Sequence, residues 1–88
     1  MLNLTPNARR VHHHLLTRGY RVTVRNDGYH LTVTAECPIL GACRQRSGPF
    51  RDHSATFRDL LRDLEGPAGV ERVFPQRQRA RLLTTYSG

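Results

Sequence analysis

An alternating pattern over residues 20–35 constrains the fold of this 88-residue chain more than any other feature. Apolar and polar side chains alternate on both sides of Asp27-Gly28, a pair that strongly favours a two-residue hairpin turn. With the turn centred on that pair, the predicted cross-strand pairs are Val24 with Leu31, Val22 with Val33 and Tyr20 with Ala35. Both faces are then consistent, which supports this register. The apolar face requires a cover of helices, whereas the arginine, histidine and threonine face can meet solvent.

A first helix is predicted over residues 6–18, before the hairpin. Thr5 suits the N-cap, Pro6 suits the first helical position, and Gly19 suits the C-terminal end. The apolar residues recur at helical spacing, which predicts a buried stripe of Ala8, Val11, Leu15 and Leu16.

A second helix is predicted over residues 52–65, with Asp52 or Ser54 as its cap and Gly66-Pro67 as its stop. Its apolar stripe consists of Phe57, Leu60, Leu61 and Leu64. The intervening segment, residues 37–51, contains Gly, Pro and Cys and is predicted to be a loop between two helix-hairpin halves. A short polar edge strand near Ala42–Ser47 is an option within it.

The C-terminal part allows two interpretations. Val70–Phe74 resembles a strand, and a turn over residues 75–78 would lead into a last strand at Arg79–Tyr86, since Thr and Tyr prefer strands. The alternative is a helix over residues 75–84, because its Gln, Arg, Ala and Leu residues favour helices. We favour the strands.

Together these elements predict a single α+β domain spanning residues 1–88. Two helices pack on one face of a small antiparallel sheet, in the order α-β-β-(β)-α-β-β. Helix, two or three strands, then helix is also the order of a double-stranded RNA-binding domain. The chain has no basic cluster opening the second helix and no matching hairpin loop, so the order alone does not indicate that family.

The charge of the chain is strongly positive and unevenly distributed. Fourteen arginines, no lysine and seven acidic residues give a net charge of +7. The use of Arg in place of Lys fits a GC-rich genome, but the net charge points to a polyanionic partner. Residues 1–26 carry +5 and residues 67–88 carry +3, whereas residues 52–66 carry −2. We therefore expect a polyanion to meet the hairpin and the C-terminal segment rather than the second helix.

The polar face of the hairpin is the candidate nucleic-acid-binding surface, since arginines and hydroxyls contact phosphate and sugar oxygens. It carries no aromatic residue for base stacking, so we expect binding to be directed to the backbone. Loop and C-terminal arginines are expected to extend it. The candidate binding residues are Arg21, Arg25, His30, Thr32, Arg44, Arg46, Arg77, Arg79 and Arg81.

Metal binding and catalysis have weaker support in the sequence. Cys37 and Cys43, with His53 and optionally His30, are the candidate zinc ligands, but the C-x5-C spacing of the cysteines is wider than that of the usual zinc knuckle. The consecutive residues His12, His13 and His14 point in different directions on a helix and cannot share one metal. His12 is expected to be half-buried and the other two to face outward. We therefore expect no cofactor and no bound metal.

An enzyme is not the favoured interpretation either, although His30 opposite Arg25 allows a metal-independent ribonuclease as a third alternative. The leading hypothesis is a small nucleic-acid-binding protein of the cytoplasm, from a phage or a GC-rich bacterium. The rival is a phage-type inhibitor or adaptor that docks on an acidic protein surface, by the hairpin or by a sheet edge. We expect no membrane partner, and homodimerisation is left open.

Overall fold

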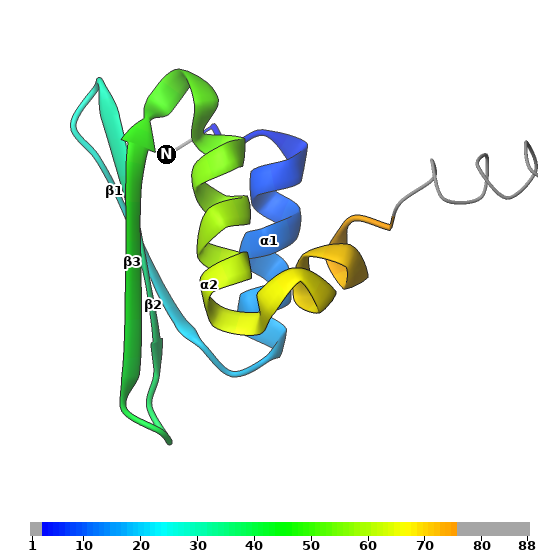
Figure 1. Ribbon diagram of the computed structural model, residues 1–88. Coiled ribbons are helices and arrows are strands. Elements are labelled where there is room, and N and C mark those ends of the chain that lie inside the picture. Colours follow the sequence, from blue (N-terminus) through cyan, green and yellow to red (C-terminus); the bar gives the residue numbers. More distant parts are fainter. Residues whose placement is uncertain (1–2, 76–88) are drawn as a thin grey trace, which may run out of the picture.

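In the computed structural model, which describes residues 3–75, two helices cover one face of a three-stranded antiparallel sheet (Figure 1). The order along the chain is α1 (Pro6–Thr17), β1 (Arg21–Asn26), β2 (His30–Cys37), β3 (Ala42–Pro49), a short 3-10 turn (Phe50–Asp52) and α2 (His53–Val73). This confirms the predicted α+β class and the placement of both helices on one face of the sheet. No helix in the described range is long and apolar enough to cross a bilayer.

Helix α1 begins and ends as its sequence predicts. The Thr5 hydroxyl accepts a hydrogen bond from the Ala8 amide at 3.2 Å, Pro6 opens the helix, and Gly19 follows it with φ +90°. Ala8, Val11 and Leu15 are fully buried. Leu16 does not join them: it remains 48% exposed, so its predicted place in the stripe is wrong.

The first hairpin is present, but its register differs by two residues from the prediction. Val24 pairs with Val33 and Val22 with Ala35. Gly28, with φ +101°, and Tyr29 occupy the centre of the turn, as the Asp27 amide bonds the His30 carbonyl. A turn centred on Asp27-Gly28 needs positive φ at both residues, whereas the observed turn needs it only at glycine. A shift of two residues keeps each strand side chain on its predicted face.

Tyr29 is the residue whose environment the shift changes. The alternation over residues 20–35 predicts that Tyr29 lies on the covered apolar face with Leu31, but it lies in the turn and is 81% exposed. The turn is held by side chains: the Asp27 carboxylate accepts the amides of Tyr29 and His30, and the Asn26 amide oxygen accepts that of Gly28.

Strand β3 confirms the optional edge strand near Ala42–Ser47 and extends it to eight residues, Ala42–Pro49, within the segment 37–51 that was otherwise expected to be a loop. It pairs with β2 along its whole length: Ala42 lies opposite Cys37 at one end, and Pro49 lies opposite His30 at the other. Gly48 lies where α2 crosses the sheet. A Cβ placed on it would come within 2.4 Å of the Thr56 hydroxyl. The missing side chain therefore allows helix and strand to approach closely.

Helix α2 confirms the predicted break and then continues beyond it. Gly66 leaves the helical conformation, with φ +73°, and Pro67 opens a further helical segment that ends at Val73. The strand predicted at Val70–Phe74 is therefore wrong. Val70, Val73 and Phe74 pack on the core at helical spacing, so tertiary burial decides against their β preference. The other predicted turn and strand positions, 76–88, lie outside the described residues.

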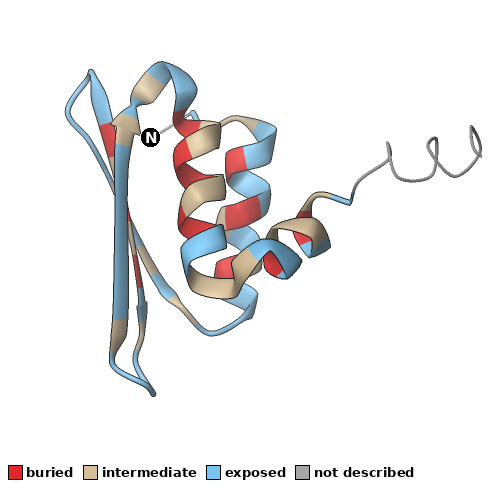
Figure 2. Ribbon diagram, in the orientation of Figure 1, coloured by how far each residue is buried: buried red, intermediate tan, exposed pale blue. Residues whose placement is uncertain are grey.

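The core lies between the helices and the inner face of the sheet, and Figure 2 shows buried residues along the facing sides of both helices. Its fully buried members are Ala8, Val11, Leu15, Leu31, Val33, Ala35, Phe57, Leu60 and Leu61. Three of the four residues predicted for the stripe of the second helix are thus confirmed as buried. The fourth, Leu64, packs against this core while partly exposed.

Glu65 links the two helices at the kink. Its carboxylate bonds His14 Nε2 at 2.8 Å and Arg18 Nε at 3.1 Å, with only 9% of its side chain exposed. The outward orientation expected for His14 is therefore wrong. Burial by itself would raise the pKa of Glu65, but the bonds from His14 and Arg18 outweigh it and hold that pKa below the ordinary 4.5.

Glu65→Gln is expected to lower the free energy of unfolding at neutral pH by about 1–2 kcal/mol, the range for a bond to a charged group. A lowered folded pKa stabilises the protein above pH 4.5, and this stabilisation is lost as the pH falls through the folded value. The variant should therefore lose less stability on acidification than the parent. Thermal unfolding followed by circular dichroism from pH 7 downward measures this; parallel curves would contradict it.

Candidate nucleic-acid interface

The outer face of the sheet is the side turned away from both helices (Figure 1). Pairing places on it Arg21, Thr23 and Arg25 of β1, then His30, Thr32, Thr34 and Glu36 of β2. From β3 it receives Cys43, Gln45, Ser47 and Pro49. Among these described strand positions there is no Phe, Tyr or Trp and no large aliphatic side chain. This confirms the polar character expected of the hairpin face.

Hydrogen bonds between neighbouring strands organise this outer face. The hydroxyls of Thr32 and Ser47 lie 2.5 Å apart, and the Thr34 hydroxyl donates to Gln45 Oε1 at 3.2 Å. Since the Gln45 oxygen is engaged, its amide N–H groups are left to donate outward. The result is a surface of hydroxyl and amide groups that suits phosphate and sugar oxygens.

The two arginines of β1 differ in their electrostatic surroundings. Arg21 Nη1 lies 3.9 Å from the Glu36 carboxylate, which compensates its charge. Arg25 is exposed and has no carboxylate within 4 Å among the described residues. Of the two outer-face arginines in the described strands, Arg25 is therefore the one without a nearby carboxylate.

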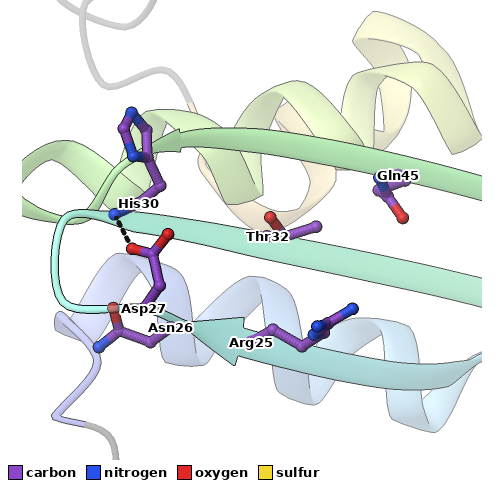
Figure 3. A pocket seen from close by; sticks show the side chains of 6 residues that line it. All are labelled: Arg25, Asn26, Asp27, His30, Thr32 and Gln45. Atoms are coloured by element: carbon purple, nitrogen blue, oxygen red, sulfur yellow. Dashed lines mark hydrogen bonds between the residues drawn. The ribbon is translucent and has the colours of Figure 1, made fainter.

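Arg25 borders a hollow of about 330 Å³ beside the β1–β2 turn. Arg25, Asn26, Asp27, His30, Thr32 and Gln45 line it (Figure 3). Figure 3 shows the Arg25 side chain running along β1 away from the turn, with the Asp27 carboxylate at the turn itself. The amides of His30 and Tyr29, in that order of effect, lower the pKa of Asp27 below 3.8, so it is ionised at neutral pH.

Arg44 and Arg46 lie on the opposite face from Arg21 and Arg25. Their partners on β2 are Ala35 and Val33, both buried against the helices. Arg46 reaches α2 and bonds both oxygens of Asp63, at 2.6 and 2.9 Å. That bidentate pair raises the pKa of Arg46 and lowers the pKa of Asp63.

The nine nucleic-acid-binding residues predicted from the sequence therefore do not form one surface. The structure brings Arg21, Arg25, His30 and Thr32 together on the outer face, separates Arg44 and Arg46 from them, and does not describe Arg77, Arg79 and Arg81. Prediction from the sequence missed Gln45, Ser47 and Asp27. The continued alternation of residues 42–47 was the available signal for the first two, but the optional edge strand there was not paired with the hairpin, so its faces were not assigned.

The cysteines and His53 do not meet as a metal site. Cys37 lies on the inner side of β2 and Cys43 on the outer side of β3, since Cys43 pairs with Glu36. His53 is buried, and its two ring nitrogens bond the Thr5 amide and the Phe50 carbonyl. Across residues 3–75, no three His, Cys, Asp or Glu side chains cluster closely enough to hold a metal ion.

Comparison with known proteins assigns no family to this arrangement. No protein-family model matches the chain, and no curated protein or solved structure matches it.

Proposed function

We propose that this protein binds the sugar–phosphate backbone of nucleic acid through the outer face of its sheet. The observation that carries the proposal is the hollow beside Arg25. There an uncompensated guanidinium lines the same hollow as the hydroxyl of Thr32 and the amide of Gln45, and His30 lines its end at the turn. A phosphate group on Arg25 with hydroxyl and amide donors beside it satisfies each of these groups.

The charge of the whole chain supports the same proposal. The outer face of the sheet and the β1–β2 turn carry two arginines, Asp27 and Glu36, so their formal charge is zero with histidine counted as neutral. The net charge of +7 attracts the polyanion over longer distances, and Arg25 then provides the local contact. Because this face offers hydrogen bonds without stacking platforms, we propose backbone contacts rather than base readout.

The paired substitution Arg21→Ala with Arg25→Ala tests the proposal. We expect the slope of log affinity against log salt to fall by about 1 to 2, since each lost phosphate contact contributes about 0.9. Most of the loss should come from Arg25, because Glu36 already compensates Arg21. Fluorescence anisotropy with labelled duplex DNA and RNA, from low to physiological salt, measures the slope.

Arg62→Ala is the matched control for the arginine pair. This guanidinium is exposed on α2 and lies 4.0 Å from Asp59, so its removal subtracts one positive charge away from the sheet, half of what the pair removes. Binding that is absent at low salt in the parent protein would refute the proposal. A slope lowered equally by the control variant would place the contact elsewhere.

A second candidate function is docking on a protein. Ile39 and Leu40, at the tip of the β2–β3 hairpin, are 91% and 80% exposed, and apolar side chains displayed in this way favour a protein contact. This observation supports the inhibitor or adaptor hypothesis. If the parent protein fails to bind nucleic acid at low salt, this candidate becomes the better explanation of the surface.

A further inference from the structure

A second group of cations lies on the helical side of the molecule, around Phe74. The guanidinium carbon of Arg10, on α1, is 5.9 Å from the centre of the Phe74 ring, and that of Arg58, on α2, is 5.2 Å from it. Both contacts are within the range of cation–π attraction. The ring therefore holds arginines from two helices within about 11 Å of each other, as the two distances require.

These two arginines lack the acidic partners that others have. Arg18, Arg21, Arg46 and Arg62 each lie within 4.0 Å of a carboxylate. Neither Arg10 nor Arg58 has such a partner among residues 3–75. Residues 76–88 contain no Asp or Glu side chain. Two like charges within about 11 Å of each other and without a paired carboxylate attract an anion, and planar guanidinium groups suit phosphate oxygens.

This group lies on the opposite side of the molecule from the outer face of the sheet. Figure 1 shows the last turn of α2 beyond the helices, on the side away from the strands. The exposed Arg9 adjoins Arg10 on α1, which has no acidic residue. A stiff duplex that rests on the outer face cannot also contact Arg10 and Arg58, since the two helices lie between them.

We infer that Arg10 and Arg58 form a second phosphodiester-binding site, so that one protein molecule bridges two nucleic-acid segments. The inference rests on the proposed function, because it assigns the same ligand chemistry to both sides. Phe74 acts as the positioning residue: it keeps both guanidiniums within about 11 Å of each other, so that they can contact one or two neighbouring phosphates. The polyanion is nucleic acid rather than an anionic membrane. A helix that binds a membrane needs an exposed apolar face, and in the described part of this helical side Leu16 is the one large aliphatic side chain that is exposed.

A bridging assay tests this inference. A biotinylated duplex is fixed on beads, and capture of a second, fluorescent duplex is measured with and without protein. Three variants are compared with the parent: Arg25→Ala, Arg10→Ala with Arg58→Ala, and the control Arg62→Ala. Each of the first two should lose capture of the second duplex at least fivefold while still binding a single duplex with a lowered salt slope. The control should capture as the parent does.

The outcomes separate the two proposals. Capture that survives Arg10→Ala with Arg58→Ala overturns the second site, and bridging through a homodimer then explains it. If the Arg10→Ala with Arg58→Ala variant loses single-duplex binding and Arg25→Ala does not, the proposed binding by the outer face is refuted and the helical site remains supported. Protein that pellets with phosphatidylglycerol vesicles but binds no duplex overturns both. Phe74→Leu keeps the charges but removes the ring, and we expect it to weaken bridging about twofold to fivefold.

Discussion

Replacing His53 with alanine is expected to lower the free energy of unfolding by about 3–4 kcal/mol, from lost hydrogen bonds and lost burial together. The imidazole is 97% buried and accepts the Thr5 amide at Nε2, 3.0 Å away. Nδ1 therefore carries the proton and donates to the Phe50 carbonyl at 2.6 Å. The ring also stacks on Phe50, with centres 4.7 Å apart. Alanine would leave two backbone groups without partners at the junction of α1 and α2.

His12→Ala is the control for this variant. His12 is half-buried and meets Phe57 edge-on at 6.5 Å, so we expect a loss of at most about 1.5 kcal/mol. Urea unfolding of both variants measures the difference. Equal losses would contradict the role given to His53. A fall in the stability of the parent protein on adding a chelator would instead restore the zinc hypothesis.

Gly48→Ala is expected to destabilise the protein by about 1–3 kcal/mol, the usual cost of overpacking. The added methyl would come within 2.4 Å of the Thr56 hydroxyl, which is buried between α2 and the sheet. Thr56 has few other conformations available, because a β-branched side chain in a helix is restricted at χ1. The helix or the strand must therefore move.

The double variant Gly48→Ala with Thr56→Ala provides the decisive comparison. The new methyl would then face the retained Cβ of residue 56 at 3.7 Å, an ordinary contact. We expect the double variant to recover most of the stability lost by Gly48→Ala, giving a coupling of at least about 1 kcal/mol. Additive losses, measured by urea unfolding, would show that close approach at Gly48 is not the cause.

The structural features that depend only on short stretches of sequence could be predicted. Helix α1 could be inferred because Thr5, Pro6 and Gly19 each satisfy a local backbone requirement. The faces of the first hairpin followed from alternation, which survives a shift of two residues. The break at Gly66 likewise depends on local conformation. These features need no knowledge of distant residues.

The candidate sites depend on pairings between distant segments. Arg44 and Arg46 alternate correctly within β3, but only pairing with β2 decides which face they occupy. The same applies to Phe74, which meets Arg10 from the other end of the chain. Its strand prediction failed because packing of residues 70, 73 and 74 on the core outweighs a preference for strands.

The sequence by itself determined both helices up to Gly66, the two strands of the first hairpin and the polar character of the hairpin face, because periodicity and capping are local. Tertiary structure alone decided which arginines are compensated. Arg46 is neutralised by Asp63 and Arg21 by Glu36, whereas Arg25, Arg10 and Arg58 lie without such partners in the described structure. The physical reason is that ion pairing depends on separations of a few ångströms between residues far apart in the chain.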